Sequence, residues 1–311
     1  MKHPSKKKIL VPVDGSDRSL NTVRYIVRNE PFISRGIVLF HVFNSVPESY
    51  WDLANDPRSA STVRQVKSWE VQQRKNIAEF MERADQLLLK GGFPPKSIVL
   101  KVQNRKKGIA RDIIQEARHG YEAVVTRRRG MTGLRRIVIG SVASKMISKL
   151  TFLPLILVGK KRPNNKILLA FDGSDNALRA VDFVGTMLGE FDYEVSLHHV
   201  IRSDGPAPFE YQHIFSSPEF TKAAAKEITY SLEMARSKLV DMGFKPEKVS
   251  FKIAKGEISR AGSIADRAKA ENFGTIVMGR RGHSRVPDFI IGRVTNKVIH
   301  MARDRTVWVI R

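Results

Sequence analysis

The chain has 311 residues, of which 42% are hydrophobic, so it is long and apolar enough for about two domains with separate cores. It contains no cysteine, which excludes disulfides, thiolate metal sites and cysteine nucleophiles. Its formal net charge is +23, and residues 1–162 carry most of it, with 32 Lys and Arg against 13 Asp and Glu. No apolar run is long enough to span a membrane and the N-terminus lacks a signal-peptide pattern, so we expect a cytoplasmic protein.

Apolar runs alternate with amphipathic stretches throughout the first half. In chain order, we expect strands at residues 9–13, 37–42, 98–102, 123–126 and 155–158, and helices at residues 19–28, 62–90 and 108–118. The first helix follows a DGSD turn, in which Ser16 and Asp17 are suitable N-caps. This alternation predicts parallel strands joined by crossover helices.

The second half repeats the first. Residues 8–17, KILVPVDGSD, match residues 166–175, KILLAFDGSD, at seven of ten positions with an offset of 158. Further along the chain the offset becomes 152, which places one net deletion of six residues in the middle of the copy. The expected strands of the second copy are residues 167–171, 195–200, 249–253, 275–278 and 306–310.

The predicted fold class is therefore α/β, with two tandem doubly wound domains. We expect the domains to be residues 1–160 and 166–311, joined by a short linker at residues 161–165. Each domain should contain a five-stranded parallel sheet flanked by helices.

The loop after the fourth strand carries the clearest chemical signal. In the second copy, Gly279, Gly282 and Gly292 are spaced as G-x2-G-x9-G just before a helix. In the first copy, Gly130 and Gly140 occupy the corresponding places. Glycines let the backbone approach a ligand and direct N–H groups at phosphate oxygens, and a helix N-terminus attracts the same anion. Turn glycines are common, but recurrence of the spacing favours a phosphate site.

With these motifs, the sequence resembles the universal stress protein family, specifically its tandem two-domain members, over essentially its whole length. The family pattern is an Asp ending strand 1, a Val after strand 2 and G-x2-G-x9-G-[ST] after strand 4. In ATP-binding members these hold ribose, adenine and phosphates, respectively. Carried onto the second copy, the resemblance implies contacts from Asp172, Val200, Met278, Gly279, Gly282, Gly292, Arg293 and Val294. Carried onto the first copy, it implies contacts from Asp14, Val42, Gly130, Gly140, Ser141 and Val142.

Both copies depart from the family pattern. Arg127 stands where the first copy's leading glycine would be, so its side chain is expected to block that site or adapt it to another anion. Arg293 replaces the hydroxyl residue in the second copy, but a guanidinium can bind phosphate through two hydrogen bonds. We therefore expect the second copy to be the better site. Asp14 and Asp172 could instead cap the helices that follow them.

The resemblance also implies an assembly. Domains of the family pair through their last strands, so residues 155–158 and 306–310 should form an intrachain pseudo-dimer. A homodimer of two-domain chains would then be the next level of assembly.

Basic residues also cluster in the first copy. Arg127, Arg128, Arg129, Arg135 and Arg136 lie in one loop, and Arg105, Lys106 and Lys107 follow the third strand. They form either a basic rim that binds a polyanion weakly or a solvated loop, and no interleaved aromatic residues are present to stack on bases. In the second copy, His198 and His199 should point to opposite faces of a strand, which argues against a joint metal site.

The leading hypothesis is a regulatory protein of the stress response that binds ATP, ADP or AMP, with or without Mg²⁺. The sequence shows no catalytic pair and no metal-ligand cluster, so an enzyme is the less favoured reading and hydrolysis would at most be slow. A slow ATPase is the second hypothesis. The third is a module that binds RNA, DNA or an anionic surface and carries vestigial nucleotide sites.

Overall fold

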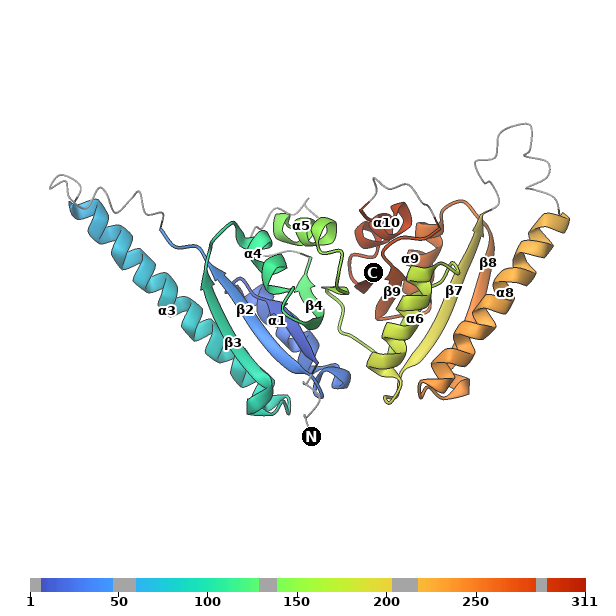
Figure 1. Ribbon diagram of the computed structural model, residues 1–311, viewed down its shortest axis with the longest axis horizontal. Helices are drawn as coiled ribbons and strands as arrows, with labels where there is room; N and C mark the ends of the chain where they lie inside the picture. The colour runs from blue at the N-terminus through green and yellow to red at the C-terminus, as the bar shows by residue number, and fades with distance from the viewer. Residues whose placement is uncertain (1–6, 47–59, 129–138, 203–217, 284–289) are drawn as a thin grey trace, which may run out of the picture. The chain divides into compact units, whose positions relative to one another are not determined.

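The computed structural model describes residues 7–46, 60–128, 139–202, 218–283 and 290–311 (Figure 1). The chain divides into two compact units. The first comprises Met1–Leu134 and Gly140–Met146, and the second comprises Arg135–Ile139 and Ile147–Arg311. None of the described helices is long and apolar enough to cross a membrane.

The first unit is an α/β layer built on parallel strands. Its elements are β1 (Lys8–Pro12), α1 (Asp17–Val27), β2 (Gly36–Phe43), α3 (Ala60–Lys90), β3 (Ile98–Asn104), α4 (Ile109–Glu116), β4 (Tyr121–Arg127) and the start of α5 (Ser141–Lys149). The strand order is β3-β2-β1-β4, with every pair parallel. Every residue of β2 is buried, as expected for a parallel strand covered on both faces.

The second unit holds the larger sheet. Its elements are β5 (Leu155–Val158), β6 (Lys166–Ala170), α6 (Asp175–Leu188), β7 (Glu194–Arg202), α8 (Pro218–Asp241), β8 (Val249–Glu257), α9 (Arg260–Ala270), β9 (Thr275–Gly279), α10 (Arg293–Met301) and β10 (Thr306–Ile310). The strand order is β5-β10-β9-β6-β7-β8. The pairs from β10 to β8 are parallel, which confirms the predicted five parallel strands of the second copy.

Strand β5 comes from the first sequence copy but belongs to the second unit. It pairs antiparallel with β10, with Leu157 opposite Val307. This is the pairing of last strands that the sequence analysis expects. Pairing covers an edge of β10 that would otherwise expose unpaired N–H and C=O groups. The compact units therefore divide the chain at a different place from the two sequence copies.

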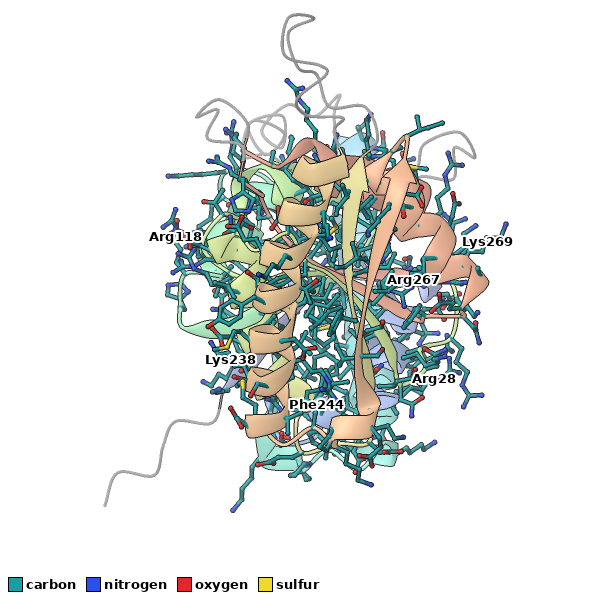
Figure 2. The ribbon with its side chains drawn as sticks, turned by 90° about the vertical axis from the view of Figure 1, so that its right-hand side faces the viewer. Arg28, Arg118, Lys238, Phe244, Arg267 and Lys269 are labelled. Atoms are coloured by element: carbon teal, nitrogen blue, oxygen red, sulfur yellow. The ribbon has the colours of Figure 1, made fainter. Side chains whose placement is uncertain are left out.

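Helix α8 covers one face of the second unit's sheet (Figure 2). Phe244, which is 3% exposed, lies where the chain passes from α8 to β8. Lys238 forms an ion pair with Asp182 of α6 at 2.5 Å, which ties the two helices together. On the opposite helix, α9, Arg267 faces the strands and Lys269 is exposed (Figure 2). These helices leave the carboxyl ends of the parallel strands to the loops that carry the predicted site.

Candidate functional site

The DGSD segment forms the same turn in both copies. In the second, Asp172 Oδ1 accepts hydrogen bonds from Ser174 N–H at 3.1 Å and from Ser174 Oγ at 2.6 Å. Ser174 is the N-cap of α6, and its Oγ accepts the N–H of Ala177 at 3.3 Å. Gly173 has a φ of +79°, a left-handed conformation that favours glycine. The serine therefore caps the helix, while the aspartate stabilises the turn through one of its two oxygens.

The first copy reproduces these contacts. Asp14 Oδ1 accepts from the N–H and Oγ of Ser16 at 3.1 and 2.6 Å, and Ser16 is the N-cap of α1. The prediction of Ser16 as an N-cap is confirmed, whereas Asp17 is the first residue of the helix. The alternative of Asp14 and Asp172 as direct helix caps is replaced by this turn geometry.

The second strand of each copy has a His-Val pair near its end, in which the valine is buried and the histidine is buried in the first copy and half-buried in the second. Val42 and Val200 are each 5% exposed at the carboxyl ends of β2 and β7. The preceding residue in the second copy, His199, places Nδ1 at 2.8 Å from the carbonyl oxygen of Phe171. His41 does the same with Val13 at 2.9 Å. A carbonyl can only accept, so Nδ1 carries the proton in both histidines.

Burial lowers the pKa of His41 and, in the same way, the pKa of His199. The carbonyl of Phe171 and the charge of Asp172 oppose the shift of the pKa of His199, while Arg260 and His283 add to it. Sequence reasoning considered His199 only as a possible metal ligand together with His198, and did not single out His41. The available signal was their recurrence, at the offset of 158, immediately before the predicted adenine-contacting valine.

The three glycines of the second copy each lie where a side chain would meet a neighbour. A Cβ on Gly279 would lie 2.8 Å from Cβ of Asn176 at the start of α6. A Cβ on Gly282 would overlap Oδ2 of Asp172, and His283 Nε2 donates to the carbonyl of Asp172 at 2.7 Å. The loop after β9 thus lies directly against the loop after β6, which joins two of the predicted contacts, Gly282 and Asp172.

The third glycine joins the end of this loop to a helix. Gly292 is the N-cap of α10 and supplies no side-chain cap, so the first turn at Arg293 and Val294 presents the positive end of the helix dipole. The N–H of Gly292 donates to the carbonyl of Arg280 at 2.9 Å. This amide is therefore engaged inside the loop, contrary to the expectation that it points at phosphate, because the two ends of the loop are tied together. Met278 is 4% exposed within β9.

Arg280 is the main residue that sequence reasoning missed. It is 5% exposed, its Nε donates to the carbonyl of Ile290 at 2.9 Å, and its Nη1 donates to that of Leu150 at 3.0 Å. Its Nη2 also donates to the carbonyl of Ile147. Burial and the neighbouring Arg281 lower the pKa of Arg280 to about 10. One guanidinium thereby holds the glycine loop and the last turn of α5, a role that a run of arginines in the sequence does not reveal.

In the first copy, an arginine fills the place of the leading glycine. Arg127 Nη1 donates to the carbonyl of Arg18 at 3.3 Å. Burial and Arg18 lower the pKa of Arg127, while the charge of Asp14 opposes that shift. The N–H of Gly140 donates to the carbonyl of Arg128 at 2.6 Å, as in the second copy.

The remaining first-copy residues are divided between described and undescribed parts of the chain. Ser141 is exposed and Val142 half-buried at the start of α5. Gly130 lies outside the described residues, as do Arg129, Arg135 and Arg136.

The proposed basic rim is only partly exposed. Arg128 is 5% exposed, so it cannot belong to a solvated surface. Arg105, Lys106 and Lys107 are exposed. The main-chain N–H groups of Lys106 and Lys107 donate to Asp112 at 2.8 and 3.0 Å, which fixes the loop that carries these side chains.

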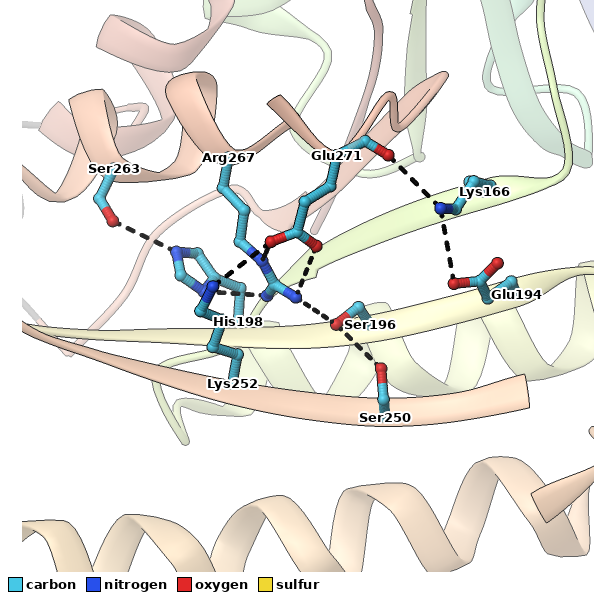
Figure 3. Close-up of polar contacts among 9 residues, drawn as sticks. All are labelled: Lys166, Glu194, Ser196, His198, Ser250, Lys252, Ser263, Arg267 and Glu271. Atoms are coloured by element: carbon cyan, nitrogen blue, oxygen red, sulfur yellow. Dashed lines mark hydrogen bonds and ion pairs between the residues drawn. The ribbon is translucent and has the colours of Figure 1, made fainter. Parts of the chain in front are cut away.

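His198 and His199 contact different partners, as the strand alternation predicts. His198 Nδ1 accepts from Arg267 Nη1 at 3.1 Å, and its Nε2 donates to Ser263 Oγ at 3.3 Å (Figure 3). Arg267 also binds Glu271 in the same cluster (Figure 3). Within the described part of the chain, no group of three or more His, Asp or Glu side chains could hold a metal ion.

Known proteins share this architecture. The model of the universal stress protein family matches residues 6–158 and again residues 163–311. Universal stress protein YxiE of Bacillus subtilis (strain 168) is 31% identical over 143 residues, which are 44% of this chain and 93% of that protein. The crystal structure of a universal stress protein from Archaeoglobus fulgidus DSM 4304 aligns with a TM-score of 0.65 and 18% identity, covering 99% of both chains.

One solved relative contains a nucleotide. The universal stress protein from Archaeoglobus fulgidus in complex with dAMP is 20% identical and has a TM-score of 0.35, covering 48% of this chain and 98% of that one. The two consecutive family matches span nearly all of the sequence, and their motifs meet at the carboxyl ends of the parallel strands. This chain therefore belongs to the universal stress protein family and carries two of its domains in tandem.

Proposed function

We propose that the second copy binds an adenine nucleotide and that the chain is a nucleotide-dependent regulator in the stress response. The observation that carries the proposal is the close approach of Gly282 to the carboxylate of Asp172. It brings the loops after β6 and β9 to the edge of the sheet where open α/β folds bind ligands. Family membership and the relative solved with dAMP agree with this choice of ligand.

Asp172 is suited to bind the ribose. Its Oδ1 is engaged by Ser174, which holds the carboxylate in place, and its Oδ2 faces the backbone of Gly282. A carboxylate accepts hydrogen bonds from vicinal hydroxyl groups without rearrangement when it is already oriented. The turn therefore serves the ligand as well as α6.

The start of α10 is suited to bind the phosphates. The N–H of Gly292 is already engaged, so the proposed anion contacts come from the first helical turn and from the exposed side chain of Arg293. The helix dipole and a guanidinium both favour a phosphate at that position.

Val200 is suited to contact the base. The hydrogen bond from His199 to Phe171 holds the end of β7 beside the residue that precedes Asp172. The proposed base and ribose contacts are thus joined by one partly buried hydrogen bond.

The second copy is preferred over the first because of Arg127. Its guanidinium reaches the backbone of α1 at Arg18 and is within electrostatic reach of Asp14, and we expect it to compete with a ribose or phosphate there. We therefore expect one nucleotide per chain.

Calorimetric titration with ATP and ADP tests this proposal, together with analysis of nucleotide released from the denatured protein. Gly282→Val should weaken binding by about a hundredfold or more, because its side chain would overlap the Asp172 carboxylate. Gly130→Val is the matched control in the first copy and should leave binding unchanged. Wild-type protein without affinity for either nucleotide would contradict the proposal, and equal losses in both variants would contradict the choice of copy.

A further inference from the structure

The outer edge of β3 in the first unit exposes an unusual amount of apolar surface. Among the described strands, β3 pairs only with β2 and ends the sheet on that side. Three of its side chains are large, apolar and well exposed: Val99 at 45%, Leu100 at 44% and Val102 at 49%. We name this strand edge, residues 98–104, the open β3 edge.

Two residues of the open β3 edge direct their backbone groups away from the sheet. Arg105 N–H donates to the carbonyl of Phe43 in β2 at 2.8 Å. Backbone groups alternate in direction along a strand, so those of Leu100 and Val102 point away from β2, whereas the N–H of Ile98 already donates to the carbonyl of Pro95. Exposed apolar side chains and outward N–H and C=O groups therefore coincide at Leu100 and Val102.

The corresponding strand of the second unit is protected. The exposed positions of β8 include Ser250, Lys252 and Lys255, and none of its large apolar residues is as exposed as those of β3. Lysines and polar residues are the usual protection of an edge strand against pairing with another chain. Strand β3 contains one lysine, Lys101, whereas β8 contains two, so the exposure of the apolar residues in β3 is not a requirement of the fold.

Basic residues flank the open β3 edge at both ends. Lys96 precedes the strand, and Arg105, Lys106 and Lys107 follow it, all exposed. Antiparallel pairing with a second copy, centred on Lys101, would place Lys101 opposite itself and Lys96 opposite Lys106. Like charges directly opposite each other destabilise strand pairs. A second copy is therefore a poor occupant, whereas an acidic one is complementary.

We propose that the open β3 edge is a docking site for an extended segment of another protein that pairs with β3 as an added strand. The segment is apolar and β-branched at its centre and carries Asp or Glu at both ends. Main-chain hydrogen bonds to Leu100 and Val102 supply affinity, as in other cases of strand addition. The carboxylates bind near Lys96 and Lys106, and so set specificity for acidic partners.

The test uses the full chain and a fluorescent synthetic peptide of alternating valine and threonine with glutamates at both ends. The expected result is saturable binding that Leu100→Lys weakens by about tenfold or more. Val71→Lys is the matched control, since Val71 is 67% exposed on α3 and lies outside the edge. A peptide with lysines in place of the glutamates should bind at least about tenfold more weakly.

Hydrogen exchange of the wild-type protein gives a second measurement that does not depend on a variant folding. The peptide should protect the amides of Leu100 and Val102, and leave those of β8 unchanged. Absence of protection at these amides would overturn the proposal. A concentration-dependent dimer that is lost in Leu100→Lys, or protection by a single-stranded oligonucleotide but not by the peptide, would overturn it in favour of a second copy or a nucleic acid.

Discussion

The two copies differ most at the first position of the glycine loop. In the second copy, Gly279 leaves room for the loop to lie against Asn176 at the start of α6. In the first, Arg127 reaches the carbonyl of Arg18, the residue that corresponds to Asn176 at the offset of 158. The same loop position thus has no side chain in the second copy and an arginine side chain in the first. The proposed preference of the nucleotide for the second copy rests on this one difference.

The two copies also differ in the cluster of charged residues that joins the sheet to the helix after the third strand. The first unit has Lys101 and Tyr121 both bound to Glu116 at 2.7 Å, and these two bonds lower the pKa of Glu116 although its burial raises it. The second unit has Arg267 bound to Glu271 and His198 instead (Figure 3). Each copy joins the two layers with a charged cluster that includes a histidine, but His119 beside Glu116 has a 62% exposed side chain, whereas His198 is buried.

Replacement of Arg280 by methionine should have the largest effect on stability. It removes the donors to three main-chain carbonyls in a buried position, and we expect a loss of about 4 kcal/mol in the free energy of unfolding. Urea unfolding measures this, with Arg281→Met as the half-exposed control. Arg128→Met would sharpen the comparison, since an equal loss would make the buried arginine a feature shared by both copies. A loss no greater than in the control would mean that the three bonds do not hold the loop.

Acid should reduce the stability of the folded protein through His198, a residue of the second copy. Burial and the neighbouring Arg267 lower the pKa of His198 to about 4 from 6.5. Above pH 6.5 both the folded and unfolded states hold the neutral ring, so the group has no effect. Between pH 6.5 and about 4 the unfolded state takes up a proton that the folded state does not, and stability falls by at most about 3 kcal/mol.

His198→Phe, which installs the residue found at the corresponding Phe40, should remove this part of the acid sensitivity. It also removes the acceptor of Arg267, at a cost of about 1 kcal/mol at neutral pH. Urea midpoints across the pH range give both values. His300→Phe, at an exposed histidine of α10, is the control and should keep the wild-type slope; a slope unchanged in His198→Phe as well would refute the assignment.

Exchange of the loop residues should move nucleotide binding between the copies. Gly279→Arg should reduce affinity by about a hundredfold, since the side chain would meet Asn176 and the space beside Asp172. Arg127→Gly should add a second, weaker site, visible in calorimetry as a stoichiometry approaching two per chain. If Arg127→Gly leaves one site, the difference between the copies does not depend on this residue.

The smallest expected effect concerns the turn aspartates. Asp172→Asn keeps an oxygen for Ser174 and so preserves the turn, but it removes the charge that faces the ligand. We expect nucleotide affinity to fall by about tenfold, which corresponds to about 1.4 kcal/mol. Asp14→Asn is the matched variant in the first copy and should leave affinity unchanged in the same titration. Equal effects of the two changes would mean that both copies bind nucleotide.

Much of the fold follows from local patterns in the sequence. The expected helix at residues 62–90 is α3 at Ala60–Lys90, and the expected strand at residues 37–42 is β2 at Gly36–Phe43. These elements are predictable because continuous apolar runs and amphipathic periods are properties of neighbouring residues. The duplicated DGSD turn is predictable for the same reason, since its hydrogen bonds join residues two or three positions apart.

The candidate site was only partly predictable. Asp172, Val200 and Gly282 could be named from their motifs, whereas Arg280 gave no signal, because its three acceptors lie 10, 130 and 133 positions away in the sequence. The prediction that the Gly292 N–H points at phosphate was also wrong. It donates to the carbonyl of Arg280 instead, a partner that depends on how the loop closes.

The sequence by itself determined the duplication, the order of strands and helices, and the positions that lack a side chain. Tertiary structure decided that β5 joins the second unit, that Arg280 is buried while Arg105 is exposed, and that Arg127 donates to the carbonyl of Arg18. The reason is physical. Periodicity and turn chemistry depend on residues close together in the chain, whereas the burial of a charge depends on carbonyls and carboxylates that only the folded backbone brings within reach.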